Sequence, residues 1–283
     1  MTKIKPIVTE RHPRDKLLRT ERLPHIWCPG CGLGKVLGAY GEAVLKSGIP
    51  VEKHAVISGI GCTGRSAGYI NVDSYHTTHG RPIAFATGLK VARPDMEVTV
   101  ISGDGDLVTI GGNHIIHAAR RNVNITVIMV NNFNYGMTGG QASATTPYHA
   151  RTSTTRYGNF EYPFNMPFLM RAAGATYIAR WTALHIKQIT DSILRSFENK
   201  GFSFIEVMSP CPKGFGKKNK FREGIHQLRY FESHSYLADE QDLSEHAPSM
   251  HPDEDLPIGE FFADGGRIDF LSNQWKIFHK DEK

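Results

Sequence analysis

The chain has 283 residues, of which 40% are hydrophobic and 22% are charged. This composition is typical of a globular protein and excludes a wholly disordered one. The net charge of +5 is mild and argues against a nucleic-acid-binding protein, which needs a concentrated basic face. The sequence has no run of 18 apolar residues that could span a membrane, and the N-terminus lacks the apolar stretch of a secretory signal. We therefore expect a cytoplasmic protein.

Strands and helices are predicted to alternate along most of the chain. Helices are expected where apolar residues recur at helical spacing, and strands where short apolar runs occur. In chain order the prediction is helix 32–46, strand 54–58, helix 83–92, strand 97–102, helix 110–120, strand 124–130, helix 168–173, strand 176–179, helix 183–199 and strand 202–208. This alternation predicts an α/β protein with a doubly wound, mostly parallel sheet.

One α/β domain with an appendage at each end is predicted. Residues 1–26 are expected to form an extended arm, and residues 27–212 the domain itself. Residues 213–283 lack the alternation of elements and are expected to wrap around the domain or around a partner. Within them, the lysine-rich run 213–220 and the acidic run 239–255 are typical of solvated segments.

Three glycine-rich segments each follow a predicted strand, at 58–61, 103–106 and 131–140. Parallel strands end at one edge of the sheet, and ligands bind outside that edge, so the three segments are expected to meet. Asp104 ends one strand and Asn132 follows the next, which would bring a carboxylate and a carboxamide together. Such hard oxygen ligands suit a Mg²⁺ ion that also binds a diphosphate.

The four cysteines are Cys28, Cys31, Cys62 and Cys211. A disulfide framework is not expected in a cytoplasmic protein of this size, and the CPGC pair lacks the preceding strand of a thioredoxin-like motif. Spacing alone leaves a structural zinc site, a 4Fe–4S cluster and unrelated buried cysteines open. Two features favour the cluster. Zinc ribbons usually pair two CxxC motifs, whereas here one CxxC is joined by two isolated cysteines. In addition, Cys62 and Cys211 both follow strands that end at the edge of the sheet where the cofactor is expected.

The segment GDGDLVTIGGNHIIHAARRNVNITVIMVNN, which starts at Gly103, resembles the thiamine diphosphate motif, in which GDG is followed by NN. Its continuation NFNYGMTGGQASATTP is similar to the β subunits of the 2-oxoacid:ferredoxin oxidoreductases. The runs WCPGCG at 27–32 and SGIGCTGR at 58–65 are similar to the same subunits. The resemblance covers residues 27–214 and supports a sheet of the thiamine diphosphate-binding type.

The resemblance implies a set of cofactor ligands. Asp104 and Asn132 would bind Mg²⁺ through their side chains, and Asn134 through its backbone carbonyl. The four cysteines would bind one 4Fe–4S cluster. The residues expected to contact thiamine diphosphate are Ile60, Gly61, Cys62, Gly103, Gly105, Asp106, Tyr135, Gly136, Met137 and Thr138.

The resemblance also implies oxidative decarboxylation of a 2-oxoacid to acyl-coenzyme A and CO₂, with electrons passing through the cluster to ferredoxin. The glutamate that activates thiamine has no local match here. In this family a larger α subunit supplies it, so we expect an obligate complex of this chain with that subunit.

Among the residues around the predicted cofactor turn, Arg65 is expected to pair with a substrate carboxylate, because a guanidinium can do so through two hydrogen bonds. His76 and His79 would be auxiliary donors, with His79 as the catalytic candidate. A second carboxylate on the substrate needs a cation, which favours 2-oxoglutarate over pyruvate.

Two alternatives are kept. A non-enzymatic zinc-binding module predicts a colourless protein without thiamine. An acetolactate-synthase-like thiamine enzyme would leave the four cysteines without a role. The sequence does not fix the 2-oxoacid.

Overall fold

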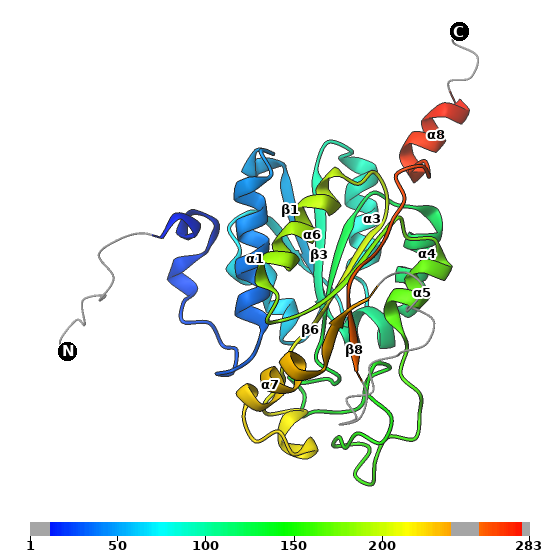
Figure 1. Cartoon of the computed structure of the whole chain (residues 1–283). Coiled ribbons are helices and arrows are strands. Elements are labelled where there is room, and N and C mark those ends of the chain that lie inside the picture. Colours follow the sequence, from blue (N-terminus) through cyan, green and yellow to red (C-terminus); the bar gives the residue numbers. More distant parts are fainter. Residues whose placement is uncertain (1–11, 239–254, 279–283) are drawn as a thin grey trace, which may run out of the picture.

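An eight-stranded sheet forms the centre of the computed structural model, which describes residues 12–238 and 255–278 (Figure 1). The strand order across the sheet is β2-β1-β3-β4-β6-β5-β8-β7. Six strands run parallel, namely β1 (His54–Ser58), β2 (Asp73–His76), β3 (Glu97–Gly103), β4 (Thr126–Asn131), β5 (Tyr177–Thr182) and β6 (Ser203–Met208). The predicted mostly parallel α/β sheet is confirmed.

Helices cover both faces of this sheet. One face carries α1 (Leu33–Lys46) and α6 (Ile186–Glu198), and the other carries α3 (Pro82–Ala92), α4 (Gly112–Arg121) and α5 (Met166–Ala173). Strands covered on both sides must be apolar on both sides. Accordingly, every residue of β1, β4, β5 and β6 is buried.

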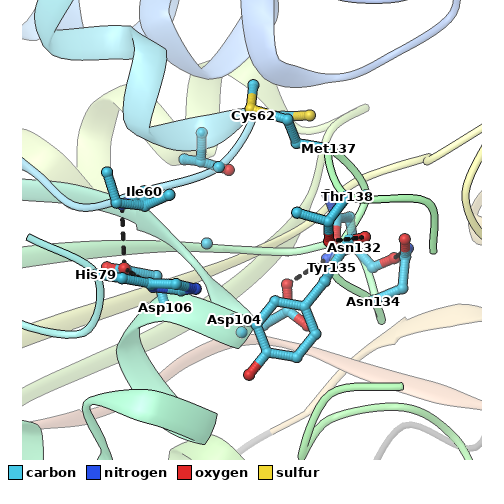
Figure 2. A pocket seen from close by; sticks show the side chains of 15 residues that line it. Ile60, Cys62, His79, Asp104, Asp106, Asn132, Asn134, Tyr135, Met137 and Thr138 are labelled. Atoms are coloured by element: carbon cyan, nitrogen blue, oxygen red, sulfur yellow. Dashed lines mark hydrogen bonds and ion pairs between the residues drawn. The ribbon is translucent and has the colours of Figure 1, made fainter. Parts of the chain in front are cut away.

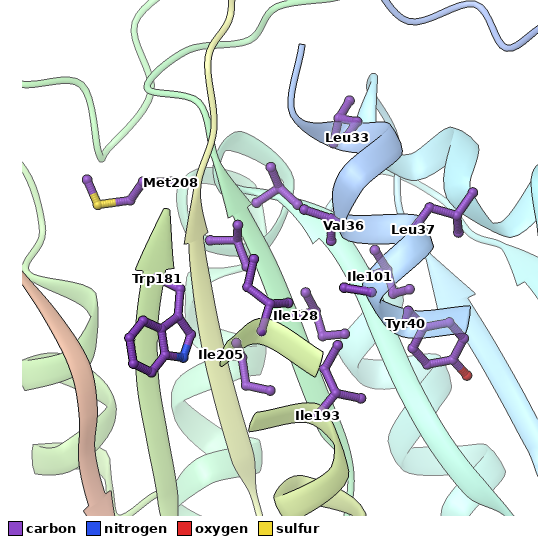
Figure 3. Packing of buried hydrophobic residues seen from close by; sticks show 14 of the residues in the cluster. Leu33, Val36, Leu37, Tyr40, Ile101, Ile128, Trp181, Ile193, Ile205 and Met208 are labelled. Carbon is purple, nitrogen blue, oxygen red and sulfur yellow. The ribbon is translucent and has the colours of Figure 1, made fainter. Parts of the chain in front are cut away.

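The α1 helix shows how helical spacing builds one of the two cores. Leu33, Val36, Leu37 and Tyr40 lie three or four positions apart, so they share one face of the helix. That face packs against the strands (Figure 3). The same buried cluster includes Ile101, Ile128, Ile193 and Ile205. Burial of these side chains holds the helix against the sheet at about 25 cal/mol for each Å² of apolar surface removed from water.

The strand order sets a switch point between β1 and β3. After β1 the chain moves to β2 at one edge, and then returns to place β3 on the other side of β1. Connections on the two sides of such a point diverge, which leaves a crevice outside the carboxyl ends of the strands. This crevice is the expected place for a ligand.

Several elements differ from the prediction. β2, β7 (Ser235–Leu237) and β8 (Leu256–Ala263) were not predicted, and neither were α2 (Ser66–Tyr69), α7 (Gly224–His234) and α8 (Phe270–Phe278). β8 pairs antiparallel with β5, so the chain after residue 213 helps to build the sheet. β8 was not predicted because it contains Pro257 and Gly259, and both residue types are unfavourable inside strands.

Two further expectations are corrected. The N-terminal arm is not extended over residues 12–26, because it contains two short 3₁₀ helices and buries Leu17 against α1. The segment 103–106 is not a simple turn, because the chain enters a helical turn at Gly105–Ile110 that leads into α4. Residues 1–11 and nearly all of the acidic run 239–255 lie outside the described residues.

A buried ion pair explains why β5 extends beyond the predicted strand. Arg180 has no exposed surface, and its Nε donates to Glu206 Oε2 of β6 at 2.7 Å. The strand was predicted to end at residue 179 because a charged residue follows. In the structure the strand continues, because Glu206 of the neighbouring strand neutralises the charge of Arg180. Within the described part of the chain, no helix is both long and apolar enough to span a membrane.

Replacing Glu206 by Leu should strongly destabilise the protein, because it leaves the Arg180 charge buried without its partner. Loss of one member of a buried pair typically costs about 3–5 kcal/mol of unfolding free energy. Urea denaturation of the variant would measure this. Glu198→Leu at an exposed position of α6 is the matched control, and equal midpoints for the two variants would contradict the expectation.

Candidate functional site

A pocket lies at the carboxyl ends of β1, β3 and β4 (Figure 2). Its walls come from the three glycine-rich segments and from His79. The lining residues are Ile60, Gly61, Cys62, Thr63, His79, Gly103, Asp104, Gly105, Asp106, Asn132, Asn134, Tyr135, Gly136, Met137 and Thr138. The prediction that the three segments meet is confirmed, and they meet beside the switch point.

Asp104 is the buried carboxylate of this pocket. Its Oδ2 accepts hydrogen bonds from Ser143 Oγ at 2.6 Å and from Thr145 Oγ1 at 2.8 Å. Burial raises the pKa of Asp104 to about 6, although the two hydroxyl donors act in the opposite direction. The protein alone therefore stabilises the ionised carboxylate poorly, and a nearby cation would stabilise it. Neither hydroxyl was predicted from the sequence, because both lie about forty residues further along the chain.

The Asn132 carboxamide lies beside Asp104 and Asn134. Its nitrogen donates to the backbone oxygen of Asn134 at 2.7 Å and to Asp104 Oδ1 at 3.1 Å. A half-turn of the carboxamide would point its oxygen at the same place, where it would join the other two oxygens as a ligand of a cation. The three predicted Mg²⁺ ligands thus lie within reach of one ion.

The turn that carries Asn132 and Asn134 is held from the core. Phe133 has φ 65°, a left-handed conformation that is unusual for a bulky residue. Its N–H donates to Asn131 Oδ1 at 3.1 Å, and its carbonyl accepts from Thr146 Oγ1 at 2.7 Å. Asn131 Nδ2 in turn donates to Glu206 Oε1 at 2.7 Å. The buried ion pair of Arg180 and Glu206 therefore holds Asn131, which in turn positions Phe133 in the turn.

Asp106 connects separate segments of the pocket wall. Its Oδ1 accepts from the N–H groups of Ile60 at 3.0 Å and Gly80 at 2.7 Å, and Oδ2 accepts from Ser102 Oγ at 2.8 Å. A Cβ atom on Gly59 would lie 1.8 Å from Oδ2, so only glycine fits there. Asp106 was predicted as a cofactor contact. It lines the pocket, but both carboxylate oxygens bind protein groups.

His79 is oriented by the same carboxylate. Its Nδ1 lies 2.5 Å from Asp106 Oδ1, so this nitrogen carries a hydrogen and donates it (Figure 2). In the neutral ring, Nε2 is then free to accept a proton. The side chain is 36% exposed and lines the pocket. His79 can therefore hold or release a proton at Nε2.

Arg65 and His76 do not line the pocket with His79. Arg65 ends a short 3₁₀ helix and is exposed. His76 is also exposed, and its Nδ1 lies 3.0 Å from the Gly64 carbonyl oxygen. Of these three predicted residues, this chain brings only His79 to the pocket.

The four cysteines gather beside the pocket as free, partly buried thiols. Burial raises the pKa of Cys31 to about 12, and the charges of Cys211, Cys62 and Cys28 raise it further. Burial likewise raises the pKa of Cys62 to about 11, with added contributions from Cys211 and Cys28. The thiols are thus close enough to repel one another as thiolates. Among the described residues, no three His, Cys, Asp or Glu side chains are arranged around a single metal ion.

Segments far apart in sequence hold these cysteines. Trp27 Nε1 donates to the Cys62 carbonyl oxygen at 2.7 Å. The N–H of Cys211 donates to Gln227 Oε1 of α7 at 3.1 Å. Cys211 Sγ lies 3.8 Å from Asn134 Oδ1. Gln227 was not predicted from the sequence, because nothing in the local pattern of α7 distinguishes it from a surface glutamine.

Comparison with known proteins gives the family. Residues 59–207 match the family described as thiamine pyrophosphate enzyme, C-terminal TPP binding domain. The chain is 48% identical to the 2-oxoglutarate synthase subunit KorB of Methanothermobacter marburgensis, over 91% of this chain and 89% of the relative. It is 38% identical to 2-oxoacid:ferredoxin oxidoreductase 2, subunit beta, of Aeropyrum pernix, over 76% and 67% of the two chains. The chain belongs to the β subunits of the 2-oxoacid:ferredoxin oxidoreductases.

A solved structure agrees with this family. The 2-oxoglutarate:ferredoxin oxidoreductase from Magnetococcus marinus, with 2-oxoglutarate, coenzyme A and succinyl-CoA bound, is 34% identical in sequence. The TM-score is 0.83, and the match covers 96% of this chain and 91% of that chain. The sheet of this β subunit is therefore the thiamine diphosphate-binding fold that the sequence motifs predicted.

Replacing Asp106 by Ala should destabilise this β subunit, because the N–H groups of Ile60 and Gly80 lose their acceptor. Each unsatisfied buried donor typically costs about 1–3 kcal/mol. Thermal unfolding would measure the loss, and Asp73→Ala at an exposed position of β2 is the control. An unfolding temperature equal to that of the control would show that water replaces the carboxylate at no cost.

Proposed function

We propose that this chain is the β subunit of a 2-oxoglutarate:ferredoxin oxidoreductase. The complex would convert 2-oxoglutarate and coenzyme A to succinyl-coenzyme A and CO₂, and would pass two electrons to ferredoxin. The named relatives and the Magnetococcus marinus structure support 2-oxoglutarate over pyruvate. The observation that carries the proposal is the position of Asn134, whose backbone oxygen lies 2.7 Å from the Asn132 carboxamide beside Asp104 and whose side chain contacts Cys211.

Asp104, Asn132 and Asn134 would hold Mg²⁺ and, through it, the diphosphate of thiamine diphosphate. Asp104 Oδ1 and the Asn134 backbone oxygen lie 3.1 Å and 2.7 Å from the same end of the Asn132 carboxamide, whose oxygen would complete a set of hard ligands for the cation after a half-turn. Backbone groups of Gly103, Gly105 and the segment from Tyr135 to Thr138 line the rest of the pocket. When bound, the cofactor supplies a carbanion that adds to the keto carbon and accepts the electrons left by decarboxylation.

A 4Fe–4S cluster fits the four cysteines better than zinc does. A zinc ion takes four sulfurs at about 2.3 Å from one centre, and zinc ribbons usually supply them from two CxxC motifs, whereas this chain has one CxxC and two separate cysteines. A cubane is larger and takes each cysteine on a different iron. Two buried donors nearby, Ser209 Oγ and Gln227 Nε2, have no acceptor among the described residues. Cluster sulfurs would supply acceptors, and the positive irons would stabilise four thiolates.

His79 is the residue of this chain proposed to act on protons, and Asp106 is proposed to position its ring. Asp106 accepts the hydrogen bond from Nδ1, so the second ring nitrogen, Nε2, is not used in this bond. His79 would then hold a proton at Nε2 next to the reacting carbonyl or carboxylate. We retain Arg65 as a candidate for the substrate carboxylate only in the assembled complex, since within this chain it lies outside the pocket.

An exposed aromatic surface supports a protein partner at this end of the molecule. Tyr157, Phe160 and Tyr162 are 102%, 79% and 82% exposed. They lie in the loop between β4 and α5, which also supplies Ser143 and Thr145 to Asp104. Aromatic patches of this kind mark interfaces. We propose that the larger α subunit covers this surface and completes the thiamine site with its glutamate.

Replacing Asp104 by Asn should weaken binding of Mg²⁺ and thiamine diphosphate at least tenfold, about 1.4 kcal/mol. The neutral side chain keeps the volume but removes the charge that the cation needs. Calorimetric titration of the cofactor-free complex would measure this change. Asp191→Asn, exposed on α6, should bind as the parent protein does. Unchanged affinity of the Asp104 variant would remove this ligand from the proposed metal site.

The anaerobically purified complex should be brown and contain about four irons per β chain, as one fully ligated cluster requires. It should reduce ferredoxin with 2-oxoglutarate and coenzyme A faster than with pyruvate and coenzyme A. Stoichiometric zinc without iron would refute the cluster. A preference for pyruvate would refute the substrate assignment and leave the cluster in place.

A further inference from the structure

The α7 helix packs directly onto the CxxC turn. A Cβ atom on Gly224, the first residue of α7, would lie 2.5 Å from the Gly30 carbonyl oxygen, and one on Gly30 would lie 3.1 Å from the Gly224 Cα atom. Side chains at either position would push the helix away. The first turn of α7 therefore lies against the backbone between Cys28 and Cys31. In Figure 1, α7 sits at one end of the domain.

Gln227 lies three residues into α7 and reaches the fourth cysteine. It has no exposed surface. Its Oε1 accepts the hydrogen bond from the Cys211 backbone N–H at 3.1 Å, so the carboxamide lies against the cysteine loop. The loop itself curls tightly here, because the N–H of Gly216 donates to the Cys211 carbonyl oxygen at 2.8 Å. The α7 helix thus contacts both the CxxC turn and the Cys211 loop.

The other end of the Gln227 carboxamide has no partner. Its Nε2 is buried and finds no acceptor within the described residues. Buried donors without acceptors are rare in folded proteins, because water is lost and nothing replaces it. A further acceptor next to Cys211 would satisfy this buried Nε2 donor of Gln227.

We propose that Gln227 donates a hydrogen bond from Nε2 to a sulfur of the cluster bound through Cys211, and that this bond raises the reduction potential of the cluster. The proposal rests on the cluster of the proposed function. Reduction adds negative charge to the sulfurs, so an N–H donor stabilises the reduced state more than the oxidised state. Partners just outside the ligand shell commonly tune metal centres in this way.

The placement of α7 acts in the same direction. It is an 11-residue helix whose N-terminal turn meets the CxxC backbone. The positive end of its dipole would face the cluster and also favour the reduced state. Gln227 is the part of this arrangement that a single substitution can remove. A higher potential makes the cluster a better acceptor for electrons that leave the cofactor pocket.

The test is an EPR-monitored redox titration of the anaerobically purified complex. Gln227→Glu keeps an oxygen that can accept from the Cys211 N–H, but replaces the donor by a negative oxygen. Gln227→Met fills similar volume and removes both groups. We expect both variants to keep their iron and to shift to more negative potentials. For Gln227→Glu the one-electron reduction equilibrium should change at least tenfold, about 59 mV, and for Gln227→Met it should change less.

The control is Gln188→Met, an exposed glutamine of α6, whose potential should equal that of the parent complex. Parent complex without iron would defeat the proposed function and is seen before any titration. Iron-replete Gln227 variants with the parent potential would overturn the inference while leaving the cluster. Loss of iron from both variants would also overturn it, because Gln227 would then only hold the Cys211 loop.

Discussion

One carboxylate joins the parts of the cofactor pocket. Asp106 accepts hydrogen bonds from the segment after β1, from the turn before α3 and from β3, and it orients His79. Each of these segments starts from a rigid strand or helix, but their relative positions depend on this shared acceptor. The charge needs little exposure to water, because four donors surround it. The pocket and its candidate proton carrier are therefore positioned by a residue whose two carboxylate oxygens both already bind protein groups.

The sequence predicted those features that follow from the order of strands and helices along the chain. Alternating strands and helices predicted the parallel sheet, and the ends of consecutive strands predicted that Asp104 and Asn132 would lie together. Both follow from the topology of a doubly wound sheet. The four cysteines also gather as expected, because two of them follow strands that end at the same edge.

Other parts depend on contacts that local patterns do not encode. Ser143 and Thr145 look like ordinary loop residues until the loop folds back onto Asp104. Arg180 reads as a strand end, although Glu206 neutralises it from the next strand. Arg65 follows Cys62 closely in sequence, yet it lies at the end of a short 3₁₀ helix, Thr63–Arg65, and its side chain is exposed. Gln227 resembles a surface residue, because its role depends on the packing of α7 against Gly30 and Cys211.

The Asn132 carboxamide can satisfy the chain's own acceptors or serve a bound cation. With its nitrogen toward Asp104 and Asn134 it donates to both, and with its oxygen inward it would be a third ligand for the proposed Mg²⁺. A half-turn about one side-chain bond separates the two, while Phe133 and Thr146 keep the backbone in place. Binding of the proposed Mg²⁺ at this place would need only this half-turn of the amide and no rearrangement of the backbone turn.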